Sequence, residues 1–303
     1  MKLSIITINR NNAAGLRTTL ESTFGAQHGF DDWEQVVVDG ASTDGSFAEV
    51  DRYRGDPHLG WCVSEPDTGI YNAMNKGAAH ARGDYLLFLN SSDSLLPDVL
   101  AKVFAEPWDA DIAYGSLVVT GKGPERIWVY PPPEEITPAY FLFASLPHPA
   151  SFISRSLLAA IGGYDESFRI VSDAKFFLDA VCKKARLSRI EFSVSQFVYG
   201  EGLSSNSAHN DSHRHERERM LTPLFGKFSV ARGLRTESRP WIRERTAKDA
   251  IREPAFASVL LRVSDLCAAL WRTRMGRFLL ERFVRSVEVW ERRKSAHAVK
   301  DNP

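Results

Sequence analysis

Short apolar runs alternate with amphipathic segments along the first third of the chain. Runs with the length and composition of buried strands cover Leu3 to Ile8, Glu34 to Asp39 and Tyr85 to Leu89. Between them, apolar residues recur with helical spacing over residues 13–25, 46–54 and 70–81. This strand–helix–strand order predicts an α/β fold with a mostly parallel central sheet and helices on both faces.

Polar residues directly follow three of these strands. The segments are Thr7 to Asn11, Asp39 to Gly45 and Asn90 to Asp93. Ligands of such sheets bind beyond the carboxyl ends of the strands, so we expect the three segments to face one crevice. The first segment lacks the Gly-x-Gly-x-x-Gly pattern of dinucleotide-binding oxidoreductases, and the chain lacks the glycine-rich basic loop of sugar-nucleotide pyrophosphorylases. Both classes are therefore disfavoured.

Two aspartates follow the second strand. Asp39, at the very end of the strand, is placed to contact a nucleoside through its base or ribose. Asp44 precedes Gly45 and the next predicted helix, which is typical of a residue that caps a helix or turns the chain. We expect ligand contact for Asp39 and capping for Asp44.

The last of these segments, Asn90-Ser91-Ser92-Asp93, follows a run that is apolar enough to be core. Its carboxylate is suited to Mg²⁺ or Mn²⁺, which prefer hard oxygen ligands and would bridge a diphosphate. Taken alone the segment is a weak signal for a metal site, because most Ser/Asp clusters after strands are simple turns.

Taken in order, these segments resemble the GT-A glycosyltransferases of family 2, particularly the bacterial exopolysaccharide enzymes of the colanic-acid type. In the first half the resemblance rests on Ser4 to Thr7, Val36 to Ser46, Glu65 to Gly77, Ala81 to Tyr85 and Phe88 to Asp93. In the second half it rests on His148 to Phe152, Ile161 to Phe168 and Ser172 to Phe177. It covers residues 1 to about 205, and the order and spacing of the motifs carry it.

The resemblance implies a role for each matching residue. Asp93 corresponds to the metal-binding aspartate, and Asp173 to the general base that removes the proton of the acceptor hydroxyl. The residues expected to contact the nucleotide sugar are Thr7, Asn9, Asp39, Ser42, Asp67, Asn75, Lys76 and Ser92. His148 is expected to contact the acceptor, and Mg²⁺ or Mn²⁺ is the implied cofactor.

Three of these residues also have ordinary structural interpretations. Asp173 precedes an apolar helical stretch and is equally suited to cap it. Lysines on helices, such as Lys76, are usually solvated. A histidine beside a proline, such as His148, is as often a structural hydrogen-bonding residue as a ligand-binding one.

The sequence departs from the family at the metal motif. The family often has two or three acidic residues there, whereas this chain has only Asp93, with Asn90 and Ser92 in the other positions. One carboxylate supplies few ligands, which predicts modest metal affinity and leaves metal independence open. It also leaves open a catalytically weak scaffold that binds sugar nucleotides or glycans.

Length and composition limit the number of domains and the kinds of site that the chain can contain. The 303 residues are enough for one large domain and an appendage, and Cys62, Cys182 and Cys267 have neither metal-ligand nor disulfide spacing. The apolar run at the N-terminus is too short for a signal peptide, and no stretch reaches the roughly 20 apolar residues of a membrane span. We therefore predict a cytoplasmic enzyme.

The formal net charge of zero hides an asymmetry. Residues 1–210 hold 17 Lys+Arg and 26 Asp+Glu, whereas residues 211–303 hold 21 and 12. We predict a catalytic domain over residues 1–225, with a nucleotide-sugar half (1–100) and an acceptor half (101–225), followed by a basic amphipathic helical tail over 226–303. The tail is suited to an anionic membrane surface, and equally to packing on the catalytic domain or a second subunit.

Two shorter segments near this boundary have alternative interpretations. Residues 200–206 are predicted to form either a mobile loop over bound nucleotide or a linker. His209 and His213 have the spacing of metal ligands on a helix, but the charged residues 214–219 beside them favour a solvated helix.

The sequence therefore predicts an inverting glycosyltransferase. It would move a sugar from UDP- or GDP-sugar to a hydroxyl of a glycan or lipid-linked oligosaccharide, in the synthesis of a bacterial surface polysaccharide, with no nucleic-acid partner. The linkage and the sugar depend on pocket shape rather than on fold.

Overall fold

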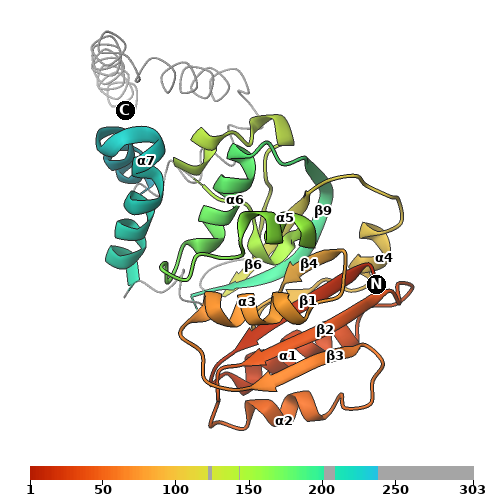
Figure 1. The fold of residues 1–303 in the computed structure, drawn as a ribbon. Helices are drawn as coiled ribbons and strands as arrows, with labels where there is room; N and C mark the ends of the chain where they lie inside the picture. The colour runs from red at the N-terminus through yellow and green to blue at the C-terminus, as the bar shows by residue number, and fades with distance from the viewer. Residues whose placement is uncertain (122–124, 143, 201–208, 238–303) are drawn as a thin grey trace, which may run out of the picture.

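The computed structural model describes residues 1–121, 125–142, 144–200 and 209–237. Its first half holds β1 (Leu3–Asn9), α1 (Ala13–Phe24), β2 (Trp33–Asp39), α2 (Ser46–Asp51), β3 (Leu59–Ser64), α3 (Ile70–His80) and β4 (Tyr85–Phe88). All the strands and helices predicted for this half are confirmed, with ends that shift by one to three residues. Figure 1 shows the strands side by side, with helices covering them.

The second half is more irregular. It contains β5 (Ser94–Leu95), α4 (Val99–Val103), β6 (Ile112–Gly121), β7 (Arg126–Trp128), β8 (Ser151–Ser154), α5 (Arg155–Ile161), α6 (Ser172–Cys182), β9 (Leu187–Tyr199) and α7 (Asn210–Glu237). Three short 3₁₀ helices, η1 (Pro133–Glu135), η2 (Pro138–Leu142) and η3 (His148–Ala150), connect β7 to β8.

One nine-stranded sheet runs through both halves in the order β3-β2-β1-β4-β8-β6-β9-β5, with β7 added beside β6. Strands β3, β2, β1 and β4 are parallel, which confirms the predicted parallel sheet where the ligand segments lie. Strand β8 is antiparallel to both β4 and β6, so the sheet becomes mixed in the second half. The four parallel strands therefore point all their carboxyl ends at one edge.

Alternate side chains of these strands enter different apolar cores. Ile6 and Val36 pack with Tyr71 and Met74 of α3 on one face, whereas Val37 packs with α1 on the other. Helix α3 lies so close to β1 that a Cβ at Gly77 would sit 2.5 Å from a methyl group of Ile6. A glycine at this position lets the helix approach the sheet, which in turn fixes the residues at the helix start.

Helix α7 bears on two expectations. The helix continues across residue 225, and the domain boundary there stays a prediction. The charged segment 214–219 at its start is solvated only in part: Arg214, His215 and Arg219 are exposed, whereas Glu216 and Arg217 are only 9% and 4% exposed. Further along the helix, Met220 and Leu221 join the main apolar core. Within the described residues, none of the helices is long and apolar enough to span a bilayer.

Two further predictions fall on parts of the chain that lie outside the described residues. These are the loop over residues 201–206 and the basic amphipathic helix after residue 237.

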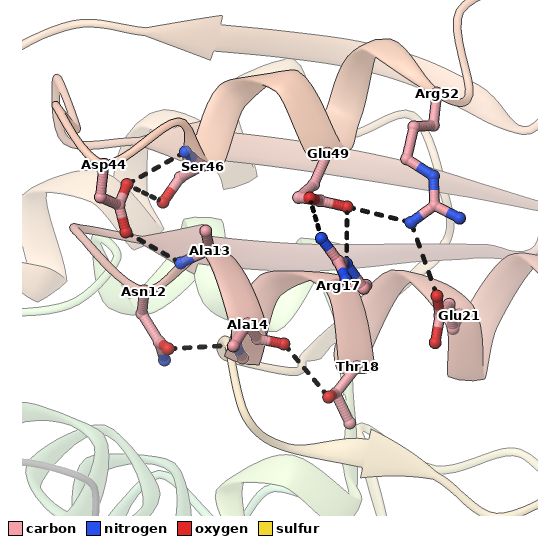
Figure 2. Close-up of polar contacts among 11 residues, drawn as sticks. Asn12, Ala13, Ala14, Arg17, Thr18, Glu21, Asp44, Ser46, Glu49 and Arg52 are labelled. Carbon is pink, nitrogen blue, oxygen red and sulfur yellow. Dashed lines mark hydrogen bonds and ion pairs between the residues drawn. The ribbon is translucent and has the colours of Figure 1, made fainter.

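Helices α1 and α2 are joined by charged groups (Figure 2). The Asp44 carboxylate accepts hydrogen bonds from the backbone N–H of Ala13, at the start of α1, and from Ser46, at the start of α2. The predicted capping role of Asp44 is thereby confirmed. Further along, Glu49 accepts a bidentate pair from Arg17 at 3.0 and 2.7 Å and a third bond from Arg52 at 3.0 Å.

The Glu49 network predicts a pH-dependent part of the stability. Hydrogen bonds from Arg17 and Arg52 lower the pKa of Glu49 from 4.5 to about 2. A carboxylate whose pKa is depressed on folding contributes stability above its unfolded pKa and loses it as the pH falls towards the folded value. We therefore expect Glu49→Gln to lower the free energy of unfolding at pH 7 by about 1 kcal/mol.

Urea unfolding of both proteins between pH 7 and pH 2 measures this effect, and the difference should shrink steadily below pH 4.5. Asp51→Asn on the same helix is the control, because Asp51 pairs only with Arg54 at an exposed position and should change little. A difference that stays constant with pH would contradict the explanation.

Candidate active site

The carboxyl ends of β1, β2 and β3 meet at the Asp39 carboxylate. One oxygen, Oδ1, accepts hydrogen bonds from Asn9 Nδ2 at 2.9 Å and Ser42 Oγ at 2.6 Å. The other, Oδ2, accepts from the Ser42 backbone N–H at 2.9 Å and Ser64 Oγ at 2.6 Å. Burial alone would raise the pKa of Asp39, but these hydrogen bonds together lower it. Asp39 is thus an ionised carboxylate that holds three strand ends in register.

This arrangement differs from the one expected for Asp39. The side chain is fully buried and its acceptor positions are used within the chain, so contact with a nucleotide would require one internal bond to be exchanged. The neighbouring Asn9 is better placed, because its Oδ1 is buried without a hydrogen-bond partner. An unsatisfied acceptor of this kind is suited to an N–H or O–H group of a ligand.

Thr7 lies deeper in the sheet than a ligand-contacting residue would. It is fully buried, its hydroxyl donates to the Leu89 carbonyl at 2.8 Å, and it accepts a bond from Gln35 Nε2 at 2.9 Å. Thr7 therefore ties β1 to β4 and β2. Its contact with a nucleotide stays a prediction.

The segment after β4 is joined to the start of α1. The Asn12 amide donates to Ser92 Oγ at 3.0 Å and accepts from the Gly15 N–H at 3.1 Å. The Ser92 N–H in turn donates to the Gly15 carbonyl at 3.1 Å, and Ser91 N–H to the Ile8 carbonyl at 3.2 Å. The three polar segments after β1, β2 and β4 therefore meet at one edge of the sheet, as the sequence predicted.

Asp93 is more buried than a residue open to a crevice would be. It is 7% exposed, and burial raises its pKa to about 8, an effect that a backbone hydrogen bond from Asn90 partly offsets. The residues before it, Asn90, Ser91 and Ser92, are half-buried. The carboxyl group of Asp93 is therefore mostly protonated at neutral pH unless a positive charge lies beside it.

The donor set at this segment suits a hard cation, though it is small. Within the described part of the chain, no three Asp, Glu, His or Cys side chains form a cluster that would hold a metal ion. The oxygens of this segment that could act as metal ligands are Asn90 Oδ1, Ser92 Oγ and the Asp93 carboxylate. Asn90 Oδ1 is buried without a hydrogen-bond partner. These oxygens fit Mg²⁺ or Mn²⁺ only if a ligand completes the coordination.

The residues predicted on and before α3 are engaged within the chain. Asn75 donates to the Tyr164 carbonyl and to Glu166, each at 2.9 Å, and accepts from the Tyr164 N–H at 2.8 Å. Lys76 pairs with Glu65 at 2.7 Å and donates to the Pro66 carbonyl at 2.9 Å. Asn75 thus fastens α3 to the turn before α6, and a nucleotide contact by either residue stays a prediction.

Asp67 lies closer to the strand ends. Its Oδ1 accepts from the Gly69 N–H at 2.9 Å, and a Cβ at Gly40 would sit 2.4 Å from its Oδ2. The side chain of the exposed Arg10 passes the same glycine. Asp67 therefore lies beside Gly40, directly after β2, and its contact with a nucleotide sugar stays a prediction.

Asp173 and His148 lie in one aromatic cluster in the second half. Asp173, in the first turn of α6, accepts a hydrogen bond from the Tyr71 hydroxyl at 2.9 Å. His148 Nε2 is 2.8 Å from the Tyr164 hydroxyl, and its ring stacks on Phe88 with centroids 5.2 Å apart. Burial lowers the pKa of His148, which the charge of Asp173 partly opposes, so the imidazole is neutral at neutral pH.

Comparison with known proteins identifies the family of this chain. The model of the family described as Glycosyl transferase family 2 matches residues 4–162, more than half of the 303-residue chain. The chain belongs to glycosyl transferase family 2. Among its curated relatives is an uncharacterised glycosyltransferase of Mycobacterium tuberculosis, 36% identical over 198 residues that cover 60% of this chain and 70% of the relative. The PGL/p-HBAD biosynthesis glycosyltransferase of the same organism is 32% identical over 210 residues, covering 67% of this chain and 78% of the relative.

Solved structures support the GT-A fold of this family 2 chain. Staphylococcus aureus TarS 1-349 in complex with UDP-GlcNAc has a TM-score of 0.59 and 20% identity, covering 80% of this chain and 78% of TarS 1-349. The mannosyltransferase PcManGT from Pyrobaculum calidifontis, in complex with GDP-Man and Mn²⁺, has a TM-score of 0.55 and 18% identity, covering 92% and 82%. At these identities the likeness establishes the fold alone.

Sequence reasoning missed several residues of this family 2 site. Ser64 and Asn12 complete the strand-end network, and Tyr71 contacts the carboxylate of Asp173. Tyr71 lies within the motif Glu65 to Gly77, but its spacing on α3 indicates only a core position. The hydroxyl on an otherwise buried face was the available signal, because a buried tyrosine normally directs its O–H to a partner.

The Asp39 network makes a prediction about folding. In Asp39→Asn an NH₂ group would face hydrogen-bond donors of Asn9, Ser42 or Ser64, and one buried acceptor would be lost. We expect the free energy of unfolding to fall by about 1–3 kcal/mol, measured by urea unfolding at pH 7. Asp56→Asn is a matched control, because the Asp56 side chain accepts a local hydrogen bond from the His58 N–H, in the loop before β3. Unchanged stability with loss of nucleotide binding would instead assign Asp39 to direct ligand contact.

Proposed function

We propose that this family 2 chain is an inverting glycosyltransferase that uses Asp173 as general base and a UDP- or GDP-sugar as donor. The observation that supports this most is the hydrogen bond between Tyr71 and Asp173. Helix α3 packs on β1 and β2, whose carboxyl ends form the polar edge, and its Tyr71 reaches across to the first turn of α6. The contact ties the candidate base to the strands that would bind the donor.

The polar edge is suited to a nucleotide sugar. Asn9 Oδ1 is an unsatisfied buried acceptor at the end of β1, and Ser42 lies beside the Asn9 side chain. Ser92 contacts Asn12, and Asp67 lies beside Gly40. The TarS and PcManGT structures were obtained with UDP-GlcNAc and GDP-Man respectively, which supports either nucleotide in the proposal.

A divalent cation belongs to the proposal. When bound, Mg²⁺ or Mn²⁺ would neutralise charge on the departing diphosphate. The residues that would hold it are Asp93 and Asn90, with Ser92 beside them. PcManGT, which has the same fold, was crystallised with Mn²⁺.

Asp173 has the properties that a general base needs. It lies half-buried in the first turn of α6, and it accepts a hydrogen bond from the Tyr71 hydroxyl. A base that takes the acceptor proton on the face opposite the leaving group leads to inversion at the anomeric carbon. His148, neutral and bonded to Tyr164, would orient the acceptor as a hydrogen-bonding group rather than as an acid.

The acceptor is proposed to be a glycan or a lipid-linked oligosaccharide. Another face of α6 borders a cavity of about 270 Å³, lined among others by Asp165, Ser172, Lys175 and Asp179. Carboxylates, a hydroxyl and an ammonium group together suit the hydroxyls of a sugar. Relatives named for PGL/p-HBAD and teichuronic acid biosynthesis support a surface glycan or glycolipid as the product. The proposal places the reaction in the cytoplasm, at the inner face of the membrane.

Replacement of the proposed base gives the main test. We expect Asp173→Asn to lower turnover by about 10²–10⁴-fold, because an amide cannot take the acceptor proton, while UDP or GDP binding and the unfolding midpoint stay close to those of the wild type. Product formation from UDP- and GDP-sugars, with calorimetry of the nucleotides, measures both. Asp51→Asn, at an exposed position on α2 where Asp51 pairs with Arg54, is the control and should remain active. Wild-type turnover in Asp173→Asn would remove Asp173 as base.

The small donor set at Asn90 to Asp93 leaves a second candidate, a scaffold that binds sugar nucleotides without catalysis. The same assays separate the two. Nucleotide binding without turnover on any acceptor would favour the scaffold, whereas product from the wild type would exclude it.

The metal assignment predicts coupled binding. We expect Mn²⁺ to tighten UDP or GDP binding about tenfold, or 1.4 kcal/mol, and EDTA to reverse the effect. In Asp93→Asn this coupling should be lost with little change in stability, because Asp93 with a pKa of about 8 is already mostly neutral at pH 7. Asp98→Asn, an exposed position that pairs with His28, should keep the coupling. Equal nucleotide affinity with and without Mn²⁺ would mean that this chain needs no metal.

A further inference from the structure

Helix α7 directs a buried carboxylate at the segment that precedes α6. Glu216 Oε1 accepts a hydrogen bond from the backbone N–H of Arg169 at 2.8 Å. Its Oε2 accepts from the N–H groups of Ile170 at 2.9 Å and Val171 at 3.2 Å. Glu216 is only 9% exposed, so these three bonds replace most of its hydration. Hydrogen bonds to an ionised acceptor are about twice as strong as neutral ones.

The segment that Glu216 binds lacks a cap of its own. The N-cap residue of α6 is Val171, which makes no side-chain capping bond. A carboxylate near a helix N-terminus is also favoured by the helix dipole. Glu216, more than 40 residues along the chain, therefore supplies from a different helix what a serine or aspartate usually supplies locally.

The same segment contacts the candidate base from its other side. The Tyr71 hydroxyl is 2.7 Å from the Ile170 carbonyl oxygen and 2.9 Å from Asp173 Oδ1. The backbone of residues 169–171 is thus held between Glu216 of α7 and Tyr71 of α3. Asp173 follows this segment directly, in the first turn of α6.

A second contact from α7 supports this arrangement. The Arg219 guanidinium lies 3.7 Å from the centre of the Phe168 ring and donates to the Ser167 carbonyl at 2.7 Å. The residues of this segment that α7 contacts therefore extend from Ser167 to Val171.

We propose that Glu216 is a positioning residue for transfer: it fixes the backbone of residues 169–171 and so sets where Asp173 presents its carboxylate. The inference rests on the proposed function, in which Asp173 is the base. Misplacing a reacting group by about 1 Å is enough to lower a rate about 10²-fold, so a loosened segment is costly even when the protein stays folded.

Two variants test the role. Glu216→Gln keeps the shape but turns an NH₂ donor towards backbone N–H groups, and Glu216→Ala removes the bonds. For both we expect kcat to fall about 10- to 100-fold, while KM for the donor and the number of UDP or GDP sites per chain stay within twofold of the wild type. Hydrogen exchange of the amides at 169–171 should become faster in both. Glu218→Gln, the same charge change two residues along α7, is the matched control and should behave as the wild type.

The outcomes separate positioning from other roles. Wild-type kcat in Glu216→Gln, or an equal loss in Glu218→Gln, would overturn the inference. A fall in kcat matched by an equal fall in nucleotide-binding sites would also overturn it, because that pattern reports only unfolded protein. Asp173→Asn tests the proposed function separately. If Asp173→Asn is inactive and Glu216→Gln is fully active, only the positioning role fails; an active Asp173→Asn removes the base and with it the residue that Glu216 would position.

Discussion

The buried Asp39 carboxylate is the contact on which the polar edge depends. It joins Asn9 at the end of β1, Ser42 in the turn after β2 and Ser64 at the end of β3. Parallel strands bring their carboxyl ends together but do not fix the loops beyond them. An ionised group with four donors fixes these loops, because removing any one donor would leave charge poorly solvated inside the protein. The strand ends are thereby tied together without a ligand.

A second centre is fixed by contacts between distant parts of the chain. Asp173 is reached by Tyr71 from α3, and the segment before it is reached by Glu216 from α7. Neither contact is local in sequence, and each relies on a helix that is itself packed on the core. Helix α3 serves both centres, since it covers β1 and β2 and also carries Tyr71. The close approach allowed by Gly77 therefore affects the position of the candidate base as well as the packing of the core.

The sequence predicted the first half of the fold well because its signals are local. Apolar runs of strand length and helical periodicity identify β1, β2, β4 and α1 to α3, and strand order implies that their carboxyl ends meet. The second half was less predictable, because short 3₁₀ helices and antiparallel strands depend on tertiary contacts rather than on periodicity. The burial of Glu216 within the charged start of α7 was missed for the same reason, because its carboxylate binds backbone N–H groups of a distant segment.

The site residues, like the fold, were predictable only in part. The meeting of the segments after β1, β2 and β4 follows from topology and was predictable. Which side chains contact a ligand and which form structural hydrogen bonds was not predictable, because a sequence motif does not distinguish the two roles. Asn75 and Lys76 lie in a family motif and yet are engaged by Tyr164 and Glu65 within the chain. Asn9 and Asn90 stand out only once the structure shows that their amide oxygens lack partners.

Charge at the polar edge constrains how a diphosphate is accommodated. Asp39 is ionised and Asp67 lies beside it, so the edge carries negative charge of its own. The oxygens without partners, Asn9 Oδ1 and Asn90 Oδ1, are acceptors and repel phosphate oxygens. A diphosphate placed there needs positive charge from Arg10, which is exposed beside Gly40, or from a cation held by the segment after β4. Because Asp93 is mostly neutral while it is buried alone, the proposed cation and diphosphate would favour each other: the diphosphate would supply ligands that Asn90 to Asp93 lack, and the cation would remove the repulsion.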